Sequence, residues 1–116
     1  MSENILPFRR PINWAKLRSD EAEAIIRHRA SPDTTGNVVF TNHTWQRVSE
    51  REIPTDAVYK ILRTGWVSEG PFQNENGEWQ VTVAKPLKGN RNAGVVTVIV
   101  DDDKTLVVLT VEWMDL

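Results

Sequence analysis

The pattern of apolar and polar positions divides the chain into a helical first half and a strand-rich second half. Residues 14–30 are rich in helix formers, and Ser19 followed by two acidic residues marks an internal helix start. Residues 31–37 have the composition of a loop, and residues 38–41 predict a short extended segment that leads into the next helix.

Two further helices are predicted on either side of Pro54. Thr41 or Asn42 can cap the first of them, and the Ile-Pro pair should end it. Thr55 is then expected to cap the next helix, and Gly65 is its natural stop. The apolar residues of this last helix share one face, which predicts that it packs on a core: Val58, Ile61 and Leu62.

From Trp66 onward the pattern is that of β-strands. Segments rich in Val, Thr and Trp alternate with turn-forming segments, and they predict strands at residues 66–69, 79–85, 95–100 and 106–113. Consecutive strands with short connections indicate a four-stranded antiparallel meander. Because helices precede the strands, we expect an α+β fold with the N-terminal helices packed on one sheet face.

Alternation along the last predicted strand sorts its side chains between the two sheet faces. One set is entirely apolar and is expected beneath the helices: Val107, Leu109, Val111 and Trp113. The other set begins apolar and ends polar, so Thr110 and Glu112 are expected to line a cleft on the opposite face.

The length of 116 residues predicts one compact domain that buries a core without a metal or a disulfide. Within it we separate an N-terminal helical extension, residues 1–37, from an α+β domain, residues 38–116. The chain has no cysteine, which excludes disulfides, thiolate zinc sites and thiol nucleophiles. No apolar run approaches the roughly 18 residues of a membrane span, so we expect a soluble, cytoplasmic protein.

The net charge of −2 is unevenly distributed. Residues 1–67 hold ten Lys and Arg against eight Asp and Glu, whereas residues 68–116 hold four against eight. The overall acidity argues against strong non-specific binding of nucleic acid, but it leaves room for a local cationic site in the first half.

Such a site is indicated by His43, Arg47 and Arg51, which recur at every fourth residue and form one polar stripe if the segment is helical. Trp45 and Val48 fall on the opposite arc and are expected to face a core. The imidazole lies near the positive end of the helix dipole, which disfavours its protonated form and suits a general base. Two guanidiniums beside it could stabilise a pentacovalent phosphorane.

This pattern suggests metal-free RNA cleavage, in which a 2′-OH attacks its own phosphate. The plain alternative is a solvated helix face, which is the commoner reason for such a pattern, and Glu50 on the same arc can neutralise an arginine. The nuclease hypothesis requires that the three cationic groups share one anion pocket instead of pairing with carboxylates.

Other candidates come from the strand region. Lys85 lies near the end of the second predicted strand, and Lys88 and Arg91 follow in a loop that could form a cationic flap or simply keep the surface soluble. Thr110 is either an ordinary strand threonine or a catalytic hydroxyl. The five tryptophans are assigned to the core, since no regular spacing of exposed aromatics suggests base stacking.

No cofactor or metal is expected from the motifs. Two histidines fifteen residues apart without cysteine argue against a structural zinc site, and Asp101, Asp102 and Asp103 lack the glycine and glutamate of a calcium loop. Dinucleotide, NTP and serine-hydrolase motifs are absent.

The run VVFTNHTWQRVSEREIPTDAVYKILRTGWVSEG, with the later segments EWQVTVAK, GVVTVIVDD and TLVVLTVEW, resembles a bacterial and phage family of domains of unknown function over about residues 38–113. That family is grouped with the barnase–EndoU–colicin–RelE (BECR) fold, whose members include metal-independent endoribonuclease toxins. The resemblance implies RNA as substrate, a cognate antitoxin as partner, and a site formed by His43, Arg47, Arg51, Lys85 and Thr110.

Two departures keep a second hypothesis open. The only tyrosine, Tyr59, lies in the third predicted helix instead of the last strand, and the chain is acidic where ribosome-dependent toxins are basic. A non-catalytic protein-interaction module, such as an antitoxin-like, immunity-like or phage accessory factor, would fit the same segments. Its edge strands could also pair with another chain in a larger assembly.

Overall fold

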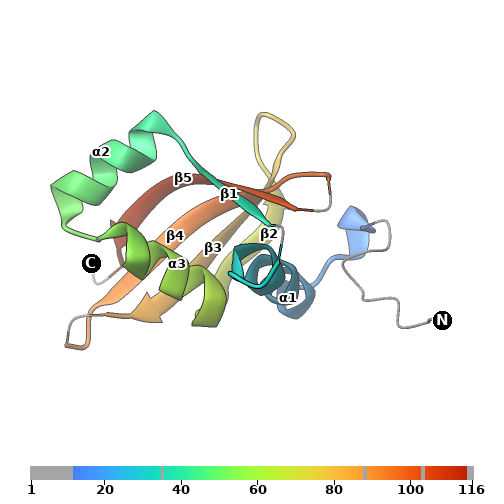
Figure 1. Cartoon of the computed structure of the whole chain (residues 1–116). Helices are drawn as coiled ribbons and strands as arrows, with labels where there is room; N and C mark the ends of the chain where they lie inside the picture. The colour runs from blue at the N-terminus through green and yellow to red at the C-terminus, as the bar shows by residue number, and fades with distance from the viewer. Residues whose placement is uncertain (1–11, 35, 88, 103, 115–116) are drawn as a thin grey trace.

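The computed structural model describes residues 12–34, 36–87, 89–102 and 104–114 as an α+β protein with three α-helices and a five-stranded mixed sheet (Figure 1). A 3₁₀ turn, Trp14–Lys16, precedes the first helix. The elements then follow in the order α1 Ser19–Ala30, β1 Asn37–Phe40, α2 Asn42–Arg51, α3 Thr55–Thr64, β2 Trp66–Gln73, β3 Trp79–Pro86, β4 Asn92–Ile99 and β5 Thr105–Trp113.

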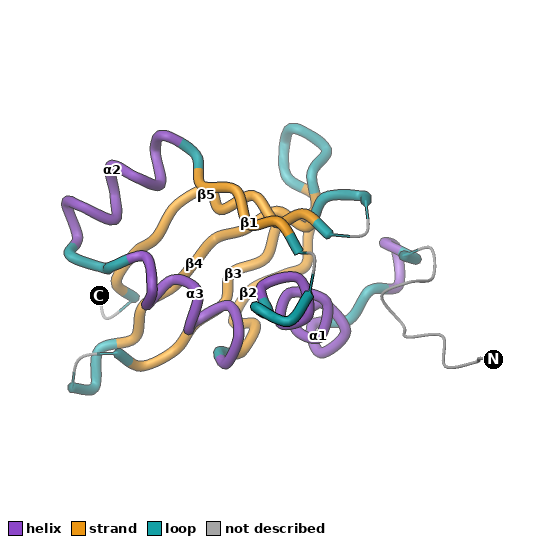
Figure 2. The backbone as a smooth tube through the Cα atoms, viewed as in Figure 1, coloured by secondary structure: helices purple, strands orange, loops and turns teal. Residues whose placement is uncertain are grey.

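The sheet has the strand order β1-β5-β4-β3-β2 (Figure 2). The predicted antiparallel meander is present as β2 to β5, but the prediction of only four strands was wrong. Residues 37–40 pair in parallel with the first half of β5 and add a fifth strand at that edge. Residues 37–40 contain no local signal that identifies their partner strand. The partner lies far along the chain: Asn37 pairs with Thr105, which is 68 positions later.

Two helix boundaries also differ from the predictions. The helix expected over residues 14–30 is split, and its α-helical part begins at Ser19, where the acidic pair had suggested a start. Thr41 caps α2 by accepting a hydrogen bond from the Thr44 amide, as predicted. Pro54, instead of Thr55, occupies the N-cap position of α3.

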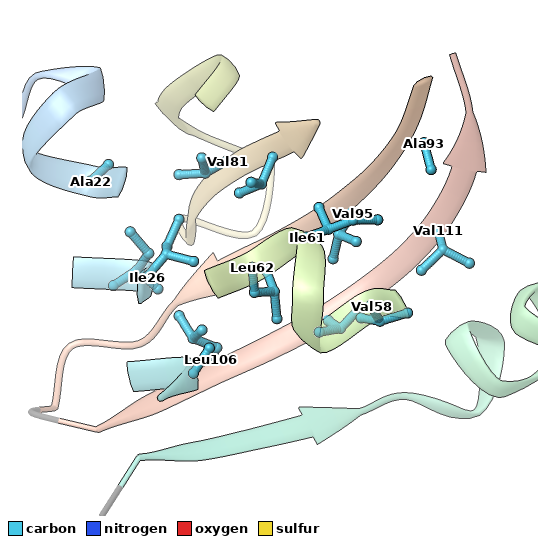
Figure 3. Packing of buried hydrophobic residues seen from close by; sticks show 14 of the residues in the cluster. Ala22, Ile26, Val58, Ile61, Leu62, Val81, Ala93, Val95, Leu106 and Val111 are labelled. Atoms are coloured by element: carbon cyan, nitrogen blue, oxygen red, sulfur yellow. The ribbon is translucent and has the colours of Figure 1, made fainter. Parts of the chain in front are cut away.

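The core lies between one face of the sheet and the helices α1 and α3 (Figure 3). Residues of α1 belong to it, although α1 falls in the segment predicted as an extension. The buried cluster includes Ala22, Ile26, Val58, Ile61, Leu62, Val81, Val95, Leu106 and Val111. We call the opposite side of the sheet the uncovered face, because no helix of the described residues packs on it (Figure 2).

A β-bulge in β5 changes which of its residues face the core. Val96 pairs with Thr110 and Thr97 pairs with Val108, so Leu109 is the extra residue. Leu106, Val108 and Val111 are all fully buried, whereas Val107 and Leu109, predicted beneath the helices, are only partly buried. The prediction was wrong for Val107 and Leu109, because one inserted residue reverses the alternation along a strand, and it is confirmed beyond the bulge, where Val111 and Trp113 face the core.

A buried arginine ties α1 to the turn between β4 and β5. The guanidinium of Arg29, which is 1% exposed, donates to the carbonyl oxygens of Val100 and Thr105 at 2.8 Å and of Asp102 at 2.6 Å. The Asp102 carboxylate accepts from the amides of Lys104 and Thr105 at 2.9 and 2.8 Å. Asp102 therefore has a structural role in this turn; Asp103 lies outside the described residues.

Within the same described ranges, no helix combines the length and the apolar character needed to cross a membrane.

Candidate functional site

Helix α2 lies along the outer edge of β5, where it continues the line of β1 (Figure 1). The Thr44 hydroxyl donates to the Val108 carbonyl at 2.5 Å, and the Thr41 amide donates to the same oxygen at 3.3 Å. Thr44 is fully buried. β1 pairs with β5 only as far as Val108, so the edge of β5 beyond that point would present unpaired carbonyl oxygens. The first turn of α2 supplies donors at the start of this edge.

The last turn of α2 is fixed to the same strand. Arg51 Nη1 donates to the Val111 carbonyl at 2.6 Å, and Trp113 Nε1 donates to the Arg51 carbonyl at 2.9 Å. Both contacts are partly buried. The guanidinium of Arg51, predicted to hold phosphate, is thus engaged by the main chain of β5.

The two flanks of α2 face different sides of the sheet. Thr44, Val48 and Arg51 are spaced as one helix face, and this face meets β5. On one flank Trp45 stacks on Phe40, which pairs with the core residue Val108 and so lies on the helix-covered side.

His43 and Arg47 occupy the other flank, which by helical geometry lies toward the uncovered face. Thr110 is directed to that same face, because its cross-strand partner Val96 lies opposite in phase to the core residue Val95. The structure thus brings His43, Arg47 and Thr110 to one side.

Of the residues at this flank, His43 has the freest side chain. It is exposed and makes no hydrogen bond or ion pair with any described residue. Arg47 pairs with Glu50, the carboxylate that the sequence suggested as a neutralising partner, and Glu50 also accepts from Gln46 Nε2 at 3.1 Å. The hydrogen bond from Arg47 lowers the pKa of Glu50.

Lys85 lies on the opposite face of the sheet from Thr110. Its cross-strand partner is Ala93, which pairs with Trp113, and Ala93 belongs to the buried cluster beneath the helices. Five candidate residues therefore divide among three places: the α2 flank with Thr110, the β5 main chain at Arg51, and the helix-covered face at Lys85. The prediction that His43, Arg47 and Arg51 share one anion pocket without carboxylate partners was wrong, because Arg47 pairs with Glu50 and the Val111 carbonyl engages Arg51. Of the predicted cationic flap, Lys88 lies outside the described residues.

Arg91 has a defined contact: its guanidinium lies 4.1 Å from the centre of the Trp113 ring. Beside Trp113 the junction of α2 and α3 encloses an open groove of about 230 Å³. Glu52, one of the residues that line it, has a left-handed backbone (φ 52°) and ends α2. The groove is lined by Glu52, Pro54, Ala57, Lys60, Pro86, Leu87 and Trp113.

One group of residues was missed in the sequence. Trp45 was predicted to face a core, but its side chain is 51% exposed. It stacks on Phe40 with ring centres 4.8 Å apart, Phe40 contacts Tyr59 at 5.8 Å, and the guanidinium of Arg63 lies 5.0 Å from the Tyr59 ring. The sequence did hold a signal for this position. Trp45 directly follows Thr44, so it cannot lie at the centre of the helix face that Thr44 packs against β5.

No cluster of three or more His, Asp or Glu side chains suited to hold a metal ion occurs among the residues that the structure describes. The polar side chains of this region are instead His43, Arg47 and Thr110 on one side, with Arg51 and Lys85 elsewhere.

No curated protein and no solved structure matches the chain. The family described as "Domain of unknown function (DUF4258)" matches residues 40–113, which run from the end of β1 through α2 and α3 to the end of β5. The resemblance to a family of domains of unknown function is confirmed, and the grouping with the BECR fold stays a prediction. Because the match covers more than half of the sequence, the chain belongs to the DUF4258 family.

Proposed function

We propose that this protein is a metal-independent endoribonuclease of toxin type on a BECR-like fold. The observation that carries the proposal is the position of His43, an exposed imidazole without a partner among the described residues, on the same α2 flank as Arg47. Thr110 is directed to the sheet face beside that flank. An acid–base group, a guanidinium and a hydroxyl are the groups that phosphodiester cleavage uses.

In the proposed step the 2′-oxygen of a ribose forms a bond to the adjacent phosphorus while the bond from phosphorus to the 5′-oxygen breaks. His43 takes the proton of the 2′-OH, and the departing 5′-oxygen is protonated by solvent. The products are a 2′,3′-cyclic phosphate and a 5′-hydroxyl. Arg47 binds the phosphate oxygens as negative charge develops on them, and Thr110 donates a hydrogen bond at the same side.

Two of the predicted residues take other roles in this proposal. Arg51 is a positioning residue, because its guanidinium holds the last turn of α2 on the Val111 carbonyl. Lys85 lies on the helix-covered face and takes no part in the step. Arg47 must exchange Glu50 for phosphate, which is feasible because exposed ion pairs are weak and screened by salt.

The test compares the wild type with His43→Ala, and Ser49→Ala serves as a matched control on the exposed surface of the same helix. Expression in bacteria should arrest growth for the wild type and for Ser49→Ala but not for His43→Ala. Purified protein should cut labelled RNA in EDTA and leave a 2′,3′-cyclic phosphate. Equal growth of all three strains together with intact RNA contradicts the proposal.

A second candidate function, a non-catalytic protein-interaction module, is favoured by a separate observation. Val39, Trp66 and Phe72 are 40%, 43% and 38% exposed, and strand alternation directs all three to the uncovered face. Trp66 and Phe72 share the edge strand β2, and Val39 lies on β1 at the opposite edge of the same face. Large exposed apolar side chains are typical of protein interfaces. Co-expression with the product of an adjacent gene tests this: a complex that Trp66→Ser abolishes and His43→Ala retains supports it.

A further inference from the structure

We infer that the exposed indole of Trp45 stacks on an unpaired base of single-stranded RNA whose neighbouring phosphate binds at His43 and Arg47. The inference rests on the proposed function and adds the substrate class to it: unpaired RNA instead of a duplex. It concerns a surface that the sequence had assigned to the core.

The indole is held in place from behind while much of it faces solvent. Trp45 is 51% exposed, yet its ring stacks on that of Phe40 with centres 4.8 Å apart and planes 25° from parallel. Phe40 is itself supported by Tyr59 of α3 at 5.8 Å. A fixed, half-exposed aromatic ring can accept a base without first being ordered, which lowers the entropic cost of binding.

Packing of α2 does not explain this position. The helix meets β5 through Thr44 and Arg51, whose hydrogen bonds fix its first and last turns. Trp45 lies on the flank of the helix, and the half of it that stays in water gains no burial energy on folding. A ligand that covers the ring would bury this remaining apolar area.

The two flanks of the first helical turn offer complementary chemistry. His43 and Trp45 are two residues apart on opposite sides of an exposed ridge that carries Asn42 and Gln46. A polynucleotide alternates anionic phosphates with planar bases, so a strand crossing this ridge can place a phosphate beside His43 and Arg47 and a base on Trp45. Every base has a π-face, so such stacking is tolerant of sequence but requires the base to be unpaired.

The other exposed aromatics that the structure describes lack this combination. Trp66 and Phe72 belong to β2, where the ionisable residue between them is Glu69, a carboxylate that would repel phosphate. Among the exposed large apolar residues of the described ranges, only Trp45 lies on the same helical turn as His43. The matched control for Trp45 is therefore Trp66, which is exposed to a similar degree.

Binding should be measured with a fluorescein-labelled 2′-O-methyl RNA oligonucleotide, which lacks the nucleophile and cannot be cleaved. We expect Trp45→Ala to raise Kd at least about tenfold, which is about 1.4 kcal/mol and within the range for one stacked base. Trp45→Phe should raise it less than about threefold, and Trp66→Ala should leave it unchanged. The same sequence closed into a duplex should bind the wild type as weakly as the single strand binds Trp45→Ala.

A second measurement uses the wild type alone, so it does not depend on the folding of a variant. An oligonucleotide with 5-iodouridine should crosslink under ultraviolet light, and the crosslinked peptide should contain Trp45. Unchanged binding by folded Trp45→Ala, an equal loss in Trp66→Ala, a crosslink elsewhere, or Trp45-dependent binding of a protein but no RNA would each overturn the inference. RNA binding that depends on Trp45 but is not followed by cleavage would retain the stacking inference and reject the nuclease proposal. RNA cleavage that is unchanged in Trp45→Ala would retain the nuclease proposal and reject the stacking inference.

Discussion

Arg51 and Val111 are joined by a hydrogen bond of 2.6 Å from the guanidinium to the main-chain carbonyl oxygen. This contact gives Arg51 a different role from Arg47, although the two arginines are four residues apart in the same polar stripe of the sequence. Arg51 fixes the last turn of α2 to β5, whereas Arg47 pairs with Glu50 on the surface of its own helix. One periodic pattern therefore contains a residue that holds the helix on the sheet and a residue whose partner is a carboxylate on the surface of its own helix.

This difference predicts opposite outcomes for the two arginines. Arg51→Ala leaves the partly buried Val111 carbonyl without its charged donor, and we expect the free energy of unfolding to fall by about 1.5–3 kcal/mol. Arg47→Ala removes only an exposed ion pair, so stability should change little while RNA cleavage falls. Urea denaturation of both variants checks the prediction, and equal stability losses would contradict it.

Much of the fold follows from local patterns in the sequence. The capping threonine Thr41, the Ile-Pro break before α3 and the alternating strands each act within a few residues, and all three are seen in the structure. The features that were missed depend on distant partners: β1 needs β5 to become a strand, and the bulge at Leu109 appears only in the pairing of β5 with β4.

The candidate site was predictable to a smaller extent. Helical spacing correctly placed His43 and Arg47 on one flank, but it could not reveal that the Val111 carbonyl engages Arg51. The position of Trp45 depended on which side of α2 meets β5, and Thr44 with its buried hydroxyl decides that. A threonine carries no strong hydrophobic signal, so the pattern assigned the larger tryptophan to the core instead.

Gly65 is required for close packing at the start of β2. The sequence suggested a glycine that ends α3 by its backbone freedom, but its φ of −80° is open to any residue. A Cβ at this position would lie 2.5 Å from the Ala84 carbonyl oxygen and 2.7 Å from that of Ile61. We therefore expect Gly65→Ala to destabilise the protein by roughly 1–3 kcal/mol through overpacking.

Thermal denaturation of Gly65→Ala checks this prediction. Gly77→Asn provides the comparison, because its φ of 79° suits asparagine better than most residues and the nearest heavy atom to an added Cβ is 3.8 Å away. A Gly65→Ala variant as stable as Gly77→Asn would show that the Ala84 strand moves aside without cost.

Arg29 is expected to be the most sensitive charged residue for folding. Its side chain is 1% exposed and serves three carbonyl oxygens of the β4–β5 turn. Arg29→Ala removes the charged donor from those acceptors and opens a cavity, so a loss of about 3–5 kcal/mol is expected. Arg29→Lys keeps the charge but not the planar fork, and it should recover only part of the loss in urea denaturation.

The turn that Arg29 holds also predicts a dependence of stability on pH. Burial raises the pKa of the Asp102 carboxyl, but hydrogen bonds from the Thr105 hydroxyl and from the amides of Lys104 and Thr105, with the charge of Arg29, together lower it from 3.8 to about 2. The folded state thus favours the ionised carboxyl more than the unfolded state does. Its stabilising contribution is complete above about pH 4 and is lost as the pH falls from about 4 to about 2.

Asp102→Asn tests this contribution, because an amide cannot ionise and cannot accept hydrogen bonds as strongly. We expect the variant to be less stable than the wild type at pH 7 and the difference to shrink between pH 4 and pH 2. Urea denaturation at each pH measures it, with the exposed neighbour variant Asp101→Asn as control. Asp20 and Glu50 also have lowered pKa values, so the free energy of unfolding of the wild type and of both variants also falls with decreasing pH because of these two groups. A constant difference between Asp102→Asn and the wild type over this range would show that the carboxyl ionises equally in folded and unfolded chains.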